Sequence, residues 1–113
     1  MTRMEIQPLD RIFAALADPA RRGMIEQLSR GQATVKELAA PAGMRLPSAL
    51  KHLRVLEEGG LVASRKVGRT RTYVMRRDTL GLLDEWLERR KAAYDAAFAR
   101  LAEAMRRMPE DLQ

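Results

Sequence analysis

The sequence predicts a mainly α-helical fold with one small β-hairpin and a long final helix. Three observations lead to this prediction. Apolar residues recur every three or four positions in several segments, as on the buried face of an α-helix. Two segments rich in valine, threonine and tyrosine flank Gly68-Arg69, a pair compatible with a tight β-turn. Beyond the hairpin, Gly81 is the one helix breaker before Pro109, which predicts a single long helix.

The first two helices are expected to meet at Asp18-Pro19. Residues 9–16 have the apolar spacing of a helix, with the stripe at Leu9, Ile12, Phe13 and Leu16. Asp18 can cap the second helix, and Pro19 can occupy its first position because a backbone N–H would have no partner there. This second helix is expected to stop at Gly31 and to bury Met24, Ile25 and Leu28.

The third helix is expected to begin with a capping box. Thr34 and Glu37 have the spacing at which each side chain can bond a free backbone N–H of the other residue. This pattern predicts a helix from about Val35 to Ala40. Pro41 and Gly43 then interrupt the chain.

The fourth helix, expected from Pro47 to Glu58, has two distinct faces. Its buried stripe falls on Ala49, Leu53 and Leu56, and Gly59-Gly60 ends it. At 100° per residue, the opposite face is short, polar and mostly cationic. A recognition helix must be slim at its first turns to enter a DNA major groove about 12 Å wide, and it needs donors for phosphates and base edges. These needs are met by Pro47, Ser48, Lys51 and Arg54.

Residues 61–67 and 70–76 are expected to form the hairpin, and its packing residues are Leu61, Val67, Tyr73 and Met75. Cations on an exposed strand can simply block pairing with another sheet. The absence of any acid between Glu58 and Asp78 favours a DNA contact instead, along the backbone or in the minor groove. The basic tip consists of Arg65, Lys66, Arg69 and Arg71. The sequence thus predicts a helix-turn-helix at about residues 34–58 and a wing at about residues 61–76.

Metal and catalytic chemistry have little support in the sequence. The chain has no cysteine, and its one histidine, His52, is a poor metal site by itself. His52 is expected to pack against the turn or to donate a hydrogen bond to a DNA phosphate. The sequence shows no nucleophile and base pair, phosphate-binding glycine loop or metal-ligand cluster. We therefore expect no catalytic activity, no bound metal and no cofactor.

Length and charge fit a single domain spanning residues 1–113. This length leaves no room for a second, catalytic domain. Twenty-one Lys and Arg against fifteen Asp and Glu give a net charge of +6, which a two-fold dimer would double. Asp10 and Arg11 interrupt any apolar run typical of a signal peptide, and no stretch approaches the ~20 apolar residues of a membrane span. A soluble, cytoplasmic protein is expected.

The final helix, about residues 79–107 with Asp78 or Thr79 as its cap, carries an apolar stripe. Its length of about 42 Å exceeds what a domain of this size can cover. The far half would leave large apolar side chains in water unless a partner helix covers them. A homodimer meets this need and places two reading heads about 34 Å apart, in successive major grooves. The expected dimerisation residues are Leu80, Leu83, Leu87, Tyr94, Phe98, Leu101 and Met105.

Two other interpretations stay open. The apolar stripe can bind a different protein, which would make the chain an interaction module with incidental affinity for DNA. Alternatively, a pocket between the first and last helices, lined by Phe13, Trp86 and Tyr94, can take a small-molecule effector in addition to DNA. Nothing in the residues identifies such a protein or small-molecule effector.

Several motifs resemble those of the ArsR/SmtB family of winged-helix repressors. The motifs are ALADPARRGMIEQL, TVKELAAPAGM, LPSALKHLRVLEEGGLV and VGRTRTYV, and the resemblance extends from Leu9 to about Met75. The final helix, with WLERRK, resembles a subgroup without metal-binding thiolates, similar to the autorepressor of the sporulation-delay system of bacilli.

The resemblance implies a homodimeric bacterial transcriptional regulator, usually a repressor that releases its operator in response to a signal. A two-fold dimer of this kind is expected to bind an inverted-repeat operator. By matching position, the DNA-reading part of the helix would include Pro47, Ser48, Leu50 and Lys51, and the wing would include the four cations of the tip. Family members commonly have a serine at the position of Leu50, so the polar contact is expected either to be replaced by an apolar contact with a thymine methyl or to be lost. The family's metal ligands are missing, because residues 34–40 hold no cysteine and the final helix holds no histidine.

Overall fold

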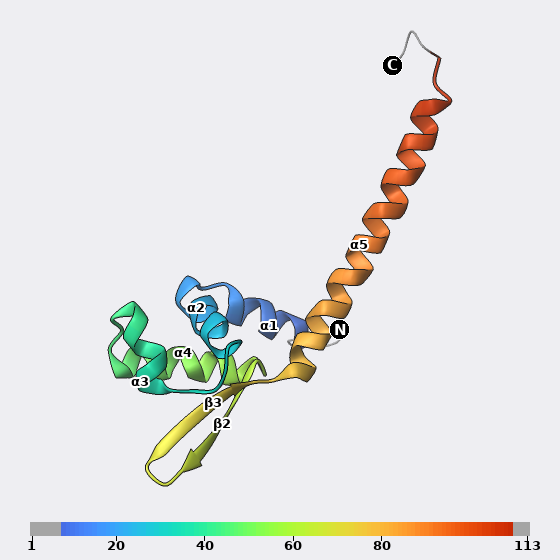
Figure 1. The fold of residues 1–113 in the computed structure, drawn as a ribbon. Coiled ribbons are helices and arrows are strands. Elements are labelled where there is room, and N and C mark those ends of the chain that lie inside the picture. Colours follow the sequence, from blue (N-terminus) through green and yellow to red (C-terminus); the bar gives the residue numbers. More distant parts are fainter. Residues whose placement is uncertain (1–7, 110–113) are drawn as a thin grey trace, which may run out of the picture. The chain divides into compact units, whose positions relative to one another are not determined.

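The computed structural model describes residues 8–109 and confirms a mainly helical fold with a small sheet and a long final helix (Figure 1). Residues up to Gly81 form one compact unit, and those from Leu82 onward form a second. In chain order the elements are α1 (Pro8–Leu16), α2 (Pro19–Leu28), β1 (Ala33–Thr34), α3 (Val35–Ala39), the 3-10 turn η1 (Ala40–Ala42), α4 (Leu46–Glu58), β2 (Val62–Val67), β3 (Thr70–Met75) and α5 (Arg77–Arg106).

The helix caps expected at Asp18 and at Thr34 are present. Asp18 has an extended backbone, and its Oδ2 accepts a hydrogen bond from the backbone N–H of Arg21 at 3.0 Å. At α3, the backbone N–H of Glu37 donates to Thr34 Oγ1 at 3.3 Å, and the N–H of Thr34 donates to Glu37 Oε1 at 2.8 Å. Each cap satisfies N–H groups that the helix itself leaves free.

The boundaries of α3 and α4 differ from the sequence prediction. The α-helix ends at Ala39, and the chain continues through η1, which contains Pro41, before Gly43 turns it with a φ of 60°. The next helix begins at Leu46, one residue before Pro47. A proline fits this second position as well as the first, because neither N–H has a partner within the helix. Arg45 is therefore the residue that precedes α4.

The sheet has three antiparallel strands in the order β1-β3-β2. The sequence predicted the hairpin but not β1, whose two residues pair with Thr72 and Tyr73. At the tip, Val67 pairs with Thr70, so that Gly68-Arg69 forms a two-residue turn. Gly68 has a φ of 64°, as this turn requires, which confirms the predicted hairpin.

The core of the first unit lies among α1 to α4 and the base of the sheet. The largest fully buried side chains are those of Ile12, Leu53, Leu56 and Leu61. Two of the residues expected to pack are exposed, and four others are only half-buried, namely Leu9, Leu16, Ile25 and Met75. Phe13 is exposed because Ile12 and Ala15 occupy the inward positions of α1. Val67 is exposed because it lies at the tip of the hairpin, beyond the core.

The final helix α5 starts two residues before its expected position. Thr79 was one of two expected caps, but its side chain is buried within the first turn of α5 and its Oγ1 donates to the carbonyl oxygen of Gly60. This contact ties the start of α5 to the end of α4. The 30 residues of the helix correspond to about 45 Å at 1.5 Å per residue. Across residues 8–109, no helix combines the length and apolar character that crossing a membrane requires.

Candidate nucleic-acid interface

Helix α4 has the two faces that the sequence predicts. Ala49, Leu53 and Leu56 are completely buried against the core of the first unit. The opposite side is exposed over the first turns of the helix, and its first turn contains no acidic residue. The exposed side chains are those of Pro47, Ser48, Leu50, Lys51 and Arg54. The core thus fixes the helix while leaving donors and cations free for an anionic partner.

An apolar pair interrupts this polar face. Leu50 is 43% exposed, and Leu46, four residues earlier on the same side of α4, is exposed to a similar degree. The residues on either side of Leu50 are oriented as the sequence predicts, because Ala49 is buried and Lys51 is exposed. Leu50 can therefore contact an apolar group of a ligand, such as a thymine methyl.

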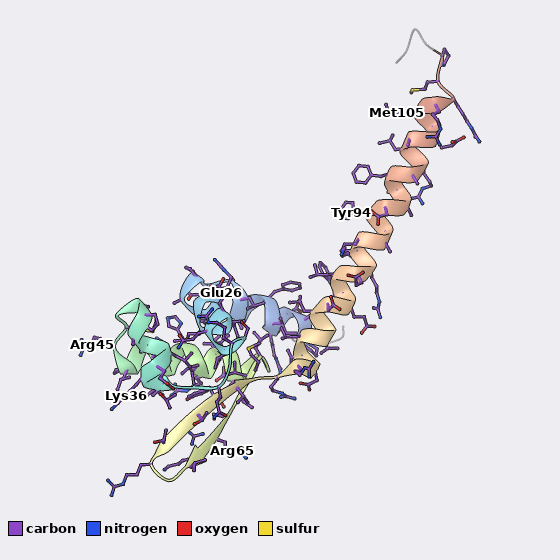
Figure 2. The ribbon with its side chains drawn as sticks, viewed as in Figure 1. Glu26, Lys36, Arg45, Arg65, Tyr94 and Met105 are labelled. Carbon is purple, nitrogen blue, oxygen red and sulfur yellow. The ribbon has the colours of Figure 1, made fainter. Side chains whose placement is uncertain are left out.

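Two further cations, Lys36 on α3 and Arg45 before α4, are exposed and were left out of the predicted site. In Figure 2, Lys36, Arg45 and Arg65 lie along the lower left of the first unit, whereas Glu26 of α2 lies on its upper side. Arg45 makes no side-chain capping hydrogen bond to α4. Its place directly before LPSALK was a usable signal, which the assignment of Pro47 as the first helical residue obscured.

His52 packs against the turn between α1 and α2. Its Nδ1 lies 3.3 Å from Nη1 of Arg21 and 3.9 Å from Oδ2 of Asp18. Arg21 is itself held by the end of α1, because its Nε donates to the carbonyl oxygen of Ala15 at 2.6 Å and its Nη2 to that of Ala14 at 3.2 Å. The hydrogen bond from the backbone N–H of Arg21 is the main cause that lowers the pKa of the Asp18 carboxyl. A phosphate contact by His52 stays a prediction.

The register of the hairpin distributes its four basic residues over two faces. Residues directly opposite each other in an antiparallel pair share a face, so Lys66 and Arg71 lie on one side and Arg65 and Thr72 on the other. Lys66 and Arg71 share their face with the buried Tyr73, whereas Arg69 lies in the turn. All four cations are exposed. The tip therefore presents positive charge to both sides.

Arg71 also makes contacts within the protein. Its Nη1 donates to Oγ of Ser64 at 2.8 Å, and this hydroxyl donates to Oε2 of Glu57 at 3.2 Å. Burial raises the pKa of the Tyr73 phenol, the Glu57 carboxylate raises it further, and Arg71 opposes the rise. Glu57 and Arg71 thus act on the same buried ring.

Helix α5 carries the apolar stripe expected from the sequence. Within it, the rings of Tyr94 and Phe98 stack with their centroids 6.4 Å apart. Arg90 of the same helix lies over the ring of Trp86 at 5.4 Å from its centroid, a cation–π arrangement. Leu83 is half-buried, and the other predicted dimerisation residues are exposed by 38% to 66%, namely Leu80, Leu87, Tyr94, Phe98, Leu101 and Met105.

The sequence predicts no metal site and leaves an effector pocket open. In the described part of the chain, no group of three or more His, Asp or Glu side chains is arranged to hold a metal ion. The effector pocket expected among Phe13, Trp86 and Tyr94 stays a prediction.

Comparison with known proteins identifies relatives of the segment that contains these elements. A family model described as a helix-turn-helix domain matches residues 16–65, from the end of α1 into β2. An HTH-type transcriptional regulator of Mycobacterium tuberculosis is 40% identical over 73 residues, which are 65% of this chain and 66% of that protein. The chain therefore spans just under two thirds of that relative's length.

Solved structures show a similar fold over more of the chain. The crystal structure of an ArsR family transcriptional regulator has a TM-score of 0.74 and 42% identity, and the similarity covers 79% of this chain and 98% of that one. The homodimeric winged helix-turn-helix DNA-binding domain of a protein from Mycobacterium bovis has a TM-score of 0.62 and 27% identity, covering 79% of this chain and 83% of that one. The arrangement of α3, α4 and the hairpin is thus a winged helix-turn-helix.

Proposed function

Because this chain belongs to the ArsR family of winged helix-turn-helix transcriptional regulators, we propose that it is a homodimeric repressor that binds an inverted-repeat operator. The observation that carries the proposal is the two-sided character of α4. A fully buried stripe of Ala49, Leu53 and Leu56 fixes the helix, and the exposed side carries Ser48, Lys51 and other donors. A rigid helix with exposed donors at its first turns is suited to a DNA major groove.

Each side chain on this surface has a proposed role. Ser48 and Lys51 contact base edges or nearby phosphates, and Leu50 contacts a thymine methyl. Arg54 and His52 contact phosphates from the same helix. The remaining phosphate contacts come from the flanking cations, namely Lys36, Arg45, Arg65, Lys66, Arg69 and Arg71. Phosphate contacts supply most of the affinity, whereas the first two turns of α4 supply sequence preference.

The proposed dimer forms through α5. Its exposed apolar stripe includes Tyr94, Phe98 and Leu101, and large apolar patches on a protein surface commonly mark interfaces. The relative from Mycobacterium bovis is homodimeric. Two copies related by a two-fold axis would read the two halves of an inverted repeat, which explains how one short helix achieves specificity.

The proposed mode of action requires no covalent chemistry. A dimer that occupies a promoter excludes other proteins from the same DNA, and its release restores access. We place the chain in the subgroup without metal sensing, since it has no cysteine. In this proposal residues 1–113 are one cytoplasmic winged-helix domain with α5 as its dimerisation helix, and the releasing signal is a protein or small-molecule effector.

Selection of bound duplexes from a random-sequence library by the purified protein tests the proposal. The expected result is an enriched inverted repeat whose half-sites are centred about 10 bp apart or a multiple of that spacing. A Ser48→Ala, Lys51→Ala variant should fail to enrich the same sequence. Recovery of no common sequence, or of a site without two-fold symmetry, would contradict the proposed function.

A further inference from the structure

A chain of hydrogen bonds joins the last turn of α4 to both strands of the hairpin. The Oγ of Ser64 on β2 donates to Oε2 of Glu57 on α4, and Nη1 of Arg71 on β3 donates to the same Oγ. A hydroxyl can donate one hydrogen bond and accept others, so Ser64 serves both partners at once. One serine therefore connects three elements of the first unit.

This chain of contacts lies where the hairpin leaves the core. Ser64 pairs in register with Tyr73, which is buried, whereas the residues from Arg65 to Arg71 are exposed. The base of the hairpin is held by the backbone, because the N–H of Leu61 donates to the carbonyl oxygen of Leu56 at 3.0 Å. The hydroxyl of Ser64 adds a side-chain contact at the boundary between the base and the exposed tip.

The charge of Glu57 indicates a structural purpose for this contact. A carboxylate close to a DNA-binding surface repels the phosphates and by itself weakens binding. Glu57 is exposed at the end of α4 but turns its Oε2 toward the hairpin, where the guanidinium of Arg71 is bound to the same hydroxyl. The carboxylate thus contacts the hairpin and can help to fix its position.

We propose that Glu57 and Ser64 are positioning residues, which hold the hairpin tip at a fixed angle to α4 so that the helix and the wing reach the same DNA duplex together. The inference rests on the proposed DNA contacts of the wing. Fixing the angle before binding avoids the entropy that ordering a mobile tip would cost. Arg71 is accordingly a part of this connection in addition to its proposed phosphate contact.

Neighbouring carboxylates on α4 provide the sharpest test. Glu57→Ala and Glu58→Ala remove the same charge, but only Glu57 accepts from Ser64. Binding is measured with the full chain and a duplex recovered by selection with the wild-type protein. Glu57→Ala is expected to bind about fivefold more weakly per half-site, the effect of one lost hydrogen bond in each subunit. Glu58→Ala is expected to bind equally or more tightly, because it removes a repelling charge. Glu57→Gln keeps an acceptor oxygen and should restore binding.

The hydroxyl of Ser64 is tested separately. Ser64→Ala should weaken binding about fivefold, and Ser64→Thr, which keeps the hydroxyl, should not. Thr72→Val removes a hydroxyl from the opposite face of the hairpin and serves as the matched control. In a chain that already carries Arg65→Ala, Lys66→Ala and Arg69→Ala, Ser64→Ala should have little further effect, because all the proposed tip contacts except that of Arg71, which belongs to the connection itself, are gone. Circular dichroism melting curves establish that each variant is folded.

The outcomes separate this inference from the proposed function. If the triple variant Arg65→Ala, Lys66→Ala and Arg69→Ala leaves affinity unchanged, the wing tip does not contact DNA and both proposals about the wing are wrong. If that variant binds weakly but Glu57→Ala or Ser64→Ala binds as the wild type does, the positioning role is wrong and the wing contacts stand. Additive losses from Ser64→Ala and the tip substitutions would also overturn the positioning role.

Discussion

Nη1 of Arg21 lies 3.3 Å from Nδ1 of His52, so a residue of α2 contacts the helix that carries the proposed DNA-reading surface. A guanidinium can only donate, which makes Nδ1 the acceptor and places the proton of the neutral imidazole on Nε2. The same guanidinium donates to two carbonyl oxygens at the end of α1. Arg21 therefore joins three helices around the proposed recognition helix.

Replacing Arg21 should lower stability more than replacing an ordinary surface arginine. Arg21→Ala leaves the carbonyl oxygens of Ala14 and Ala15 without these donors, and we expect a loss of about 1–3 kcal/mol in the free energy of unfolding. Arg21→Lys, which keeps the charge but not the forked geometry, should recover only part of it. Urea denaturation measures the difference, with Arg30→Ala in the exposed turn after α2 as the control. Equal effects of the Arg21 and Arg30 variants would contradict this role.

The cap at Asp18 predicts how stability changes in acid. The pKa of Asp18 is lowered in the folded protein, mainly by the hydrogen bond from the backbone N–H of Arg21. The stabilisation is fully present above the unfolded pKa of this group and is lost as the pH falls through its folded pKa. Asp18→Asn keeps a capping oxygen without a titrating group, so its stability should fall less steeply below about pH 4. Parallel curves for the two proteins in thermal unfolding at acid pH would contradict the prediction.

Local signals allowed much of the fold to be predicted. Asp18 and Thr34 mark helix starts because the cap and its N–H partner are only three residues apart. The hairpin was predictable because Gly68-Arg69 fixes a two-residue turn, and the same turn determines which tip cations share a face. Strand β1 could not be recognised, since two residues are too few to show an alternating pattern.

The connections around the proposed site could not be predicted in this way. Arg21 and His52 are 31 residues apart, and no periodic pattern relates them. Glu57 and Ser64 belong to different elements, and their contact depends on how the Gly59-Gly60 exit aims the hairpin. The sequence therefore predicted which residues face outward on α4, whereas the contacts that orient the helix and the wing required the structure.

Leu50 should make the protein sensitive to a thymine methyl. Deoxyuridine differs from thymidine only by the absence of this methyl. Replacing thymidine by deoxyuridine should therefore weaken wild-type binding at one position in each half-site, by about 0.8 kcal/mol or fourfold for each replacement. Leu50→Ser has no apolar group to contact the methyl and should be insensitive to the same replacement. A scan of deoxyuridine substitutions across the selected site measures this with competition binding. A wild-type protein that tolerates every replacement would exclude the proposed Leu50 contact.

The cations of α4 should determine the salt dependence of binding. Lys51→Ala with Arg54→Ala removes up to four phosphate contacts from a dimer, and the slope of log affinity against log salt should become shallower by about 3–4. Arg89→Ala with Arg106→Ala changes the net charge equally, but these two arginines pair with acids on α5. This control variant should keep nearly the wild-type slope. If both double variants change the slope equally, the effect belongs to overall charge and α4 has no special role.

The stripe on α5 should determine the oligomeric state. Phe98 and Leu101 lie one turn apart on this exposed stripe, and an aspartate at either position would place a charge in the proposed apolar interface. We expect Phe98→Asp and Leu101→Asp to sediment as monomers in analytical ultracentrifugation and to bind a full inverted repeat no more tightly than a single half-site. Arg100→Asp introduces the same residue on the polar side of the helix and should remain dimeric. Because the core of the first unit ends near the start of α5, the monomeric variants should keep the cooperative unfolding of that unit. A wild-type chain that sediments as a monomer, or a Phe98→Asp variant that stays dimeric, would show that α5 has another partner.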